Sequence, residues 1–129
     1  MSEDYLIIAP SDYTFDTFRG RVPSNFCIAD LACEEGFGID NGEWHVRISK
    51  WDPIEDCCCE LEEWFNPDQL SQIATIPSPK FFAISGLDRV RIHKAIAIIA
   101  NDPKVLIEND TVDAIIIPGD EFVRNLANE

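Results

Sequence analysis

Short runs of apolar residues predict strands in both halves of the chain. Tyr5–Ala9 is a continuous apolar run that ends at a proline, as expected for a strand. Glu43–Lys50 alternates strictly, with Trp44, Val46 and Ile48 on one face and polar residues between them, which is typical of a half-buried strand. Further strands are predicted at Asn25–Cys33, Lys80–Ser85, Val105–Glu108 and Val112–Ile117.

Turn residues separate these strands. Glu34–Gly42 contains three glycines and ends in an Asn-Gly pair, which is a strong hairpin signal, so we expect a hairpin turn there. Asn109-Asp110 predicts a second hairpin near the C-terminus. Ser11–Pro23 is polar and rich in turn residues, and we expect its two phenylalanines to tuck beneath it.

Two proline-containing pairs mark the starts of helices in the middle of the chain. Asp52 is an N-cap residue type and is followed by Pro53, the residue favoured at the first helical position. Apolar residues then recur at helical spacing as far as Phe65, with acidic residues between them. Asn66 and Pro67 predict a second, shorter helix by the same rule.

Two more helices are predicted in the last third of the chain. Ser85 with Asp88 three residues later resembles a capping box, and it predicts a helix that runs to about Ala100. The apolar anchors of that helix are Val90, Ile92, Ile96 and Ile99. A terminal helix follows Gly119. Strands and helices are mixed without a βαβ rhythm, which favours the α+β class, with an antiparallel or mixed sheet and helices on one face.

The composition is that of one globular domain spanning residues 1–129. Apolar residues make up 46% of the 129 positions, enough for a single sizeable core. No apolar run approaches the ~20 residues that a membrane-spanning helix needs. The first residues are acidic and lack a signal-peptide pattern. We therefore expect a cytoplasmic protein that does not bind membranes.

The charge is strongly acidic and unevenly distributed. Twenty-four carboxylates face 10 lysines and arginines, which gives a net charge of −14. Residues 1–65 carry a net −11 and residues 66–129 a net −3. Such a surface repels nucleic acid and anionic lipid and attracts a basic protein.

No pattern of catalytic or ligating residues stands out. His45 is predicted on the outward face of a strand and His93 on a helix, and neither accompanies a nucleophile motif. Cys57–Cys59 are consecutive, which does not match the spacing of zinc ligands, and all five cysteines are expected to be free thiols. The glycine segment matches no phosphate-binding or EF-hand motif. We predict no catalytic residue, cofactor or metal, and expect that the chain is not an enzyme.

The segment from Glu34 to Glu63 is unusual because aromatic residues are interspersed with many carboxylates. A solvated, solubilising surface is one interpretation of this pattern. The other is a docking surface for a basic protein, in which aromatic anchors surrounded by acid supply affinity and speed of encounter. Glu60 and Glu63 are expected on one helix face. The candidate binding residues are Glu34, Glu35, Asp40, Trp51, Glu55, Asp56, Glu60, Glu63 and Trp64.

The same region carries a family resemblance. The residues concerned are Phe26-x-Ile28, Cys33-x-x-Gly36-x-Gly38, Glu43-Trp44-x-Val46-x-Ile48 and Trp51-x-Pro53. This series resembles the central stretch of bacterial immunity proteins of the immunity protein 8 type. The predicted strand Lys80–Ile84 and the helix after it also look like the continuation of that pattern.

The resemblance implies a function. Immunity proteins of contact-dependent growth inhibition and other polymorphic toxin systems bind a cognate toxin domain, often a basic nuclease, and occlude its active site. On this hypothesis Glu60 and Glu63 pair with lysines and arginines of the toxin. The alternative is an acidic adaptor or regulatory subunit that binds through an apolar patch, such as the isoleucine-rich helix Arg91–Ala100 or the C-terminal segment. A third interpretation is a small hydrolase or isomerase built around carboxylates and His45.

Overall fold

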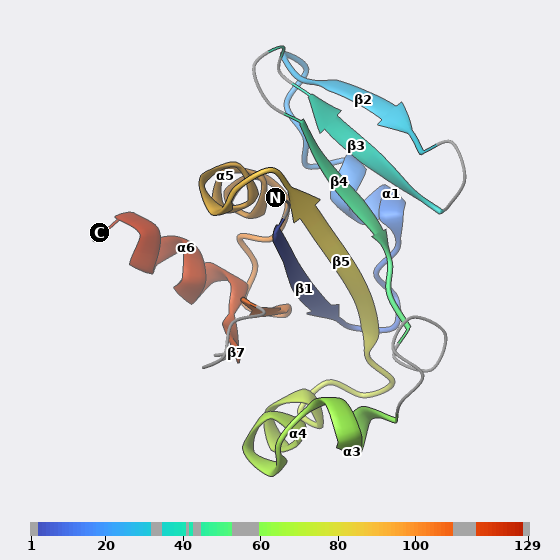
Figure 1. Ribbon diagram of the computed structural model, residues 1–129, viewed down its shortest axis with the longest axis vertical. Coiled ribbons are helices and arrows are strands. Elements are labelled where there is room, and N and C mark those ends of the chain that lie inside the picture. The colour runs from blue at the N-terminus through green and yellow to red at the C-terminus, as the bar shows by residue number, and fades with distance from the viewer. Residues whose placement is uncertain are drawn as a thin grey trace.

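Antiparallel pairing between strands from both ends of the chain organises the structure, a computed structural model that describes residues 3–31, 35–40, 42, 45–52, 60–109 and 116–127 (Figure 1). The strands are β1 (Glu3–Ala9), β2 (Cys27–Asp30), β3 (Gly36–Asp40), β4 (His45–Lys50), β5 (Lys80–Gly86), β6 (Leu106–Glu108) and β7 (Ile116–Pro118). The helices are α1 (Phe15–Arg19), α3 (Leu61–Trp64), α4 (Pro67–Ile73), α5 (Arg89–Ile99) and α6 (Gly119–Ala127).

The described strands form one sheet in the order β2-β3-β4-β5-β1-β6-β7. Every pairing in it is antiparallel. β1 pairs with β5 along its whole length, from Glu3 opposite Gly86 to Ala9 opposite Lys80. The predicted strand Tyr5–Ala9 and the predicted pairing of the last two strands are confirmed. The α+β class is confirmed as well.

The larger core lies on one face of this sheet. Ile7, Ile48 and Ile84 point into it from three strands and are fully buried. Ile92 and Ile96 of α5 and Phe18 of α1 cover them, and α6 adds partly buried residues at its margin. Burying one such isoleucine contributes about 1.5–3 kcal/mol, so this face provides most of the stability.

A smaller core lies on the opposite face of the sheet. Leu6 and Ile8 of β1 point to it, because alternate residues of a strand face opposite ways. Phe65, Ile73 and Ile76, from the segment that contains α3 and α4, pack against them. The sequence predicts helices on one face, and the structure adds this α3–α4 segment on the second.

The glycine segment predicted as a hairpin turn is instead strand β3. Phe37 and Ile39 of β3 are fully buried, and Asn41 of the Asn-Gly pair lies outside the described residues. Gly36 has a φ of +140°, and a Cβ there would lie 2.0 Å from the Ile48 carbonyl oxygen. Gly38 lies under the ring of His45. Glycines at these positions permit close packing within the sheet, so they do not mark a loop.

The neighbouring prediction for Asn25–Cys33 is only partly met. β2 is shorter and lies at the edge of the sheet with all four residues exposed, including Ile28. In β4, Val46 and Ile48 are buried while His45 and Arg47 are exposed, as the alternation predicts. Trp44 lies outside the described residues.

Helix α1 corrects the prediction of a turn-rich segment at Ser11–Pro23. The Thr17 hydroxyl accepts a hydrogen bond of 3.0 Å from the Thr14 N–H at the start of the helix. Phe18 is fully buried and Phe15 half-buried, so the expected inward position of these phenylalanines is correct. A helix of five residues shows too little periodicity to be recognised in the sequence.

The starts of α4 and α5 test the capping predictions. Asn66 caps α4 as predicted: its Oδ1 accepts from the Gln69 N–H at 2.8 Å, and Pro67 occupies the first turn. α5 is capped by Asp88, whose Oδ1 accepts from the Arg91 N–H at 3.0 Å. The predicted cap, Ser85, is wrong because this residue belongs to β5.

The apolar anchors of α5 are mostly as predicted. Ile92, Ile96 and Ile99 are fully buried, whereas Val90 is 58% exposed. The terminal helix α6 follows Pro118, as expected. Of the predicted helix after Asp52, the described part is the single turn α3, and residues 53–59, with Cys57–Cys59, lie outside the described residues. Cys27 is a free, exposed thiol.

A buried polar network ties the two halves of the fold together. The Tyr13 hydroxyl donates to Asp102 Oδ2, and Arg21 donates to the same oxygen at 2.9 Å and to the Ile99 carbonyl at 2.8 Å. Burial raises the pKa of Asp102, but hydrogen bonds from Tyr13, the Lys104 N–H and Arg21 outweigh it and lower the pKa overall. Burial and the neighbouring Asp102 raise the pKa of Tyr13.

Replacing Asp102 with asparagine should remove about 2 kcal/mol of unfolding free energy at pH 7. This loss is smaller than the ~3–5 kcal/mol that follows removal of one partner from a fully buried ion pair, because the Arg21 side chain is 32% exposed. Since folding lowers the pKa of Asp102, its contribution is present above the unfolded pKa of about 3.9 and is lost as pH falls through the folded value. Urea unfolding at pH 7 and pH 3.5 should show a penalty that shrinks at the lower pH.

The matched control is Asp120→Asn, which breaks an exposed pair with Arg124 at 3.2 Å. It should cost less than about 1 kcal/mol. A penalty for Asp102→Asn as small as that of the control would contradict a structural role for the network.

Candidate functional site

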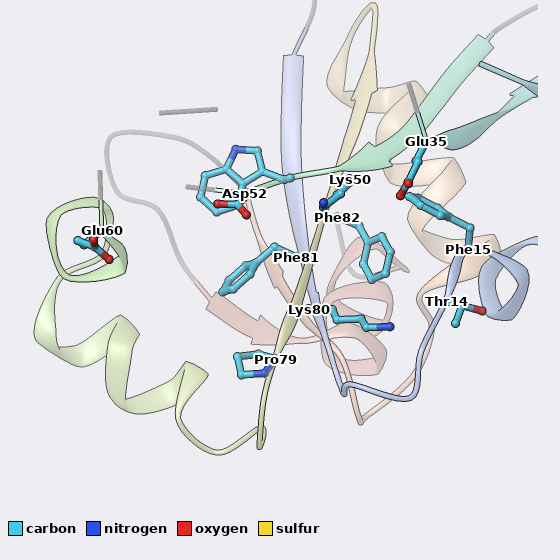
Figure 2. Close-up of a pocket in the computed structure, with 11 residues that line it drawn as sticks. Thr14, Phe15, Glu35, Lys50, Asp52, Glu60, Pro79, Lys80, Phe81 and Phe82 are labelled. Atoms are coloured by element: carbon cyan, nitrogen blue, oxygen red, sulfur yellow. The ribbon is translucent and has the colours of Figure 1, made fainter. Parts of the chain in front are cut away.

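A cavity of about 660 Å³ lies where β4 ends and β5 begins (Figure 2). This volume is within the range of ligand-binding clefts. Apolar rings and charged side chains alternate around it. Its lining residues are Thr14, Phe15, Glu35, Lys50, Trp51, Asp52, Glu60, Pro79, Lys80, Phe81 and Phe82.

Strand β5 divides the cavity into two lobes of different chemistry. Because successive residues of a strand face opposite ways, Phe81 points to one lobe and Phe82 to the other. Figure 2 shows Phe81 with Asp52 and Glu60 on one side of the strand, and Phe82 with Lys80 on the other. We call the first the tryptophan lobe (Trp51, Asp52, Glu60, Pro79, Phe81) and the second the lysine lobe (Thr14, Phe15, Glu35, Lys50, Lys80, Phe82).

Backbone hydrogen bonds fix the walls of both lobes. Trp51 N–H donates to the Phe81 carbonyl at 3.2 Å, which extends the β4–β5 pairing by one residue and holds the indole beside Phe81. Lys50 N–H donates to the Glu35 carbonyl at 3.4 Å. On the far side, the Glu60 carbonyl accepts from Glu63 N–H at 3.0 Å, so Glu60 begins the turn of α3.

Stacked and edge-on rings build the floor of the tryptophan lobe. The ring centroid of Trp51 lies 5.6 Å from that of Phe81 and 5.5 Å from that of Trp64. Phe65 is buried beneath them and stacks on Phe81 at 6.2 Å. Trp64 is 40% exposed, so this aromatic cluster reaches from the second core to the surface.

The lysine lobe has the opposite charge along its wall. Lys50 lies directly opposite Phe82 in the β4–β5 register, and Lys80 lies two residues before Phe82 on the same face. Lys80 Nζ donates to the Tyr13 carbonyl at 3.0 Å. Phe15 packs edge-on against Phe82 with ring centroids 5.2 Å apart. Among the described residues, neither lysine forms an ion pair.

Several of the predicted binding residues do meet at this cavity. Glu35, Trp51 and Glu60 line it, Trp64 packs on Trp51, and Glu63 is exposed on α3. Glu60 lies immediately before α3, and its carbonyl accepts from the N–H groups of Glu63 and Trp64. The helix face predicted for Glu60 and Glu63 stays a prediction. Both carboxylates are exposed, and Glu60 lines the cavity with Trp51.

Asp40 does not belong to the site. It ends β3, whereas Glu35 immediately precedes that strand, so about 16 Å of extended chain separates them. Its Oδ1 accepts from the Gly42 N–H at 2.6 Å, which stabilises the β3–β4 turn. Glu34, Glu55 and Asp56 lie outside the described residues.

Most of the aromatic and all of the basic lining residues are not among those predicted from the sequence. Phe81 and Phe82 were assigned only to a strand, and Lys50 and Lys80 to strand ends. The signal that unites them is the register, which places Lys50 opposite Phe82 across β4 and β5. Register is a tertiary property, and the two strands are separated by about thirty residues of sequence.

Both histidines lie away from the cavity lining. His45 lies over Gly38, and His93 Nε2 is 2.9 Å from the Tyr5 hydroxyl. In the described part of the chain, no group of three or more His, Cys, Asp and Glu residues is arranged to hold a metal ion. The cavity offers apolar faces, carboxylates and ammonium groups.

Comparison of the chain with known protein families, curated proteins and solved structures found no match. The resemblance to immunity proteins therefore stays a prediction. Within the described residues, no helix has the length and apolar character needed to cross a bilayer.

Alanine substitution of each tryptophan should distinguish a core residue, Trp51, from a surface residue, Trp64, by the unfolding free energy that is lost. Trp51 contacts Trp64, Phe65 and Phe81, so Trp51→Ala should lower the unfolding free energy by about 2–3 kcal/mol. Trp64→Ala should cost less, about 1–2 kcal/mol, because 40% of that residue is already exposed. Urea unfolding of both variants measures this difference. Equal losses would mean that Trp64 is part of the core and not a surface anchor.

Proposed function

We propose that this chain binds a basic protein partner and, as an immunity protein, neutralises a cognate toxin domain by covering its active or substrate-binding site. The observation that carries the proposal is the aromatic pair of half-buried Trp51 and exposed Trp64, with ring centroids 5.5 Å apart. The exposed carboxylate of Glu60 lines the cavity with Trp51, and the exposed Glu62 and Glu63 immediately precede Trp64 in α3. Aromatic residues at the centre of a charged surface are typical of binding hot spots.

The charge of the whole chain supports the same partner class. A net charge of −14 attracts a basic surface over a distance comparable to the Debye length, about 8 Å at physiological salt, and speeds encounter. Within the described residues, Glu60, Glu62 and Glu63 form no ion pair. On this proposal they pair with lysines and arginines that otherwise bind the phosphates of a nucleic-acid substrate.

The adaptor alternative receives less support from the fold. It requires an apolar surface, for which the isoleucine-rich helix was one candidate. Ile92, Ile96 and Ile99 of α5 are fully buried against the sheet, so that face is not available to a partner. The acidic aromatic surface is therefore the better candidate for an interface.

A growth assay tests the function directly. The C-terminal domain of the protein encoded immediately upstream is induced in cells with and without this chain. We expect growth arrest that co-expression of the chain relieves. Arrest that persists with the chain present, or an upstream domain that is harmless, would contradict the immunity proposal.

The interface prediction uses charge reversal on the same assay. Glu60→Lys with Glu63→Lys should leave the unfolding free energy within about 0.5 kcal/mol of wild type, because both residues are exposed, and should abolish protection. The matched control is Asp4→Lys with Glu121→Lys, which makes the same change of net charge at exposed positions, the first at the opposite end of β1 from the cavity. Protection should survive in the control. Equal loss in both variants would mean that net charge, and not this surface, governs binding.

A further inference from the structure

The chain repeatedly uses one arrangement to hold its own arginines. The Arg21 guanidinium lies 5.5 Å from the Tyr13 ring centroid and 5.9 Å from that of Phe18, and it pairs with Asp102 at 2.9 Å. An aromatic face and a carboxylate together suit guanidinium, which is planar, weakly hydrated and able to donate to both carboxylate oxygens.

A second arginine repeats the arrangement nearer the surface. Arg19 lies 5.3 Å from the Phe37 ring centroid and pairs with Asp30. The side chain of Asp30 is 83% exposed, so a fully buried site is not required. In both places the arginine bridges a ring that belongs to the core and a carboxylate on another element.

The tryptophan lobe contains the aromatic and acidic parts of this arrangement. Trp51 and Phe81 pack edge-on with ring centroids 5.6 Å apart, and both line the same cavity as Asp52 and Glu60. Within the described residues, no arginine or lysine lies over the ring of either residue. Lys50, the nearest cation in sequence, faces the lysine lobe on the other side of the sheet.

We propose that the tryptophan lobe binds the guanidinium group of an arginine side chain presented by a protein partner. The inference rests on the proposed binding of a basic partner and specifies the side chain that enters the cavity. Arginine is favoured over lysine because its flat group stacks on an indole and keeps its donors free for carboxylates, whereas an ammonium is compact and strongly hydrated.

The two lobes also define how the arginine enters. Lys50 and Lys80 line the lysine lobe and repel a cation that approaches from that side. Asp52 and Glu60 attract it from the side of α3 (Figure 2). The side chain therefore enters beside Glu60 and Trp64, across the surface that carries the proposed interface.

Small capped amino acids test this site without the partner. The 15N-labelled protein is titrated with N-acetyl-arginine methylamide, its neutral isostere N-acetyl-citrulline methylamide, and N-acetyl-lysine methylamide. We expect the indole N–H of Trp51, assigned by loss of its signal in Trp51→Phe, to shift with arginine. Affinity should be about fivefold or more higher for arginine than for citrulline, with lysine between them.

Two single variants test whether the carboxylate of Glu60 contributes to the affinity for the arginine probe. Glu60→Gln should weaken arginine binding about threefold, as expected for one exposed carboxylate, and leave citrulline binding unchanged. Glu121→Gln makes the same change at an exposed position of α6 and should have no effect. Equal affinities for arginine and citrulline, or equal effects of the two variants, would overturn the proposal.

This test is separate from that of the immunity function. Protection of cells without any shift at Trp51 would leave the immunity proposal intact and overturn the arginine site. Selective arginine binding by a chain that gives no protection would support the site and contradict the immunity function.

Discussion

β1 has to be covered on both faces, and this requirement organises the rest of the molecule. It lies between β5 and β6 in the sheet, and its residues from Tyr5 to Ala9 are buried whichever way they point. One face is covered by α1, α5 and α6, and the other by the segment of α3 and α4. The α3–α4 segment covers only a small part of the sheet. At its margin the aromatic cluster of Trp51, Trp64 and Phe81 reaches solvent. The candidate site exists because the second core ends there.

The elements that could be predicted from the sequence are those whose signals are local. The strand at Tyr5–Ala9, the alternation in β4 and the Asn66–Pro67 cap depend on neighbouring residues, and the structure confirms them. The predictions that were wrong concern elements whose structure depends on residues distant in sequence. Gly36 permits a strand because the Ile48 carbonyl approaches it closely, and no local pattern reveals that contact. α1 is too short to show a period, and its stability comes from Phe18, which packs on Phe82 from far along the chain.

The candidate site was predictable in its acidic part and not in its architecture. A dense run of carboxylates with tryptophans indicates a surface that attracts cations, and Glu35, Trp51 and Glu60 do share a cavity. Asp40 was grouped with them because it is close in sequence, but an extended strand carries it to the other end of β3. Lys50 and Lys80 were not predicted as site residues because they are distant in sequence, although they are close in the fold. Only the register of β4 and β5 places Lys50 and Lys80 on one face, beside the same phenylalanine.

The excess of carboxylates over basic residues matters most at this cavity. With 24 carboxylates and 10 lysines and arginines, most acidic groups have no cation of the chain available to them. On open surface, water and mobile ions screen such groups at little cost. Beside Trp51 and Phe81 the rings exclude part of that water, so a carboxylate there is stabilised most by a cation that also covers an aromatic face. Guanidinium does both, and Arg19 and Arg21 already do so inside the chain. The physical chemistry that stabilises the fold therefore also defines the side chain that a partner has to present.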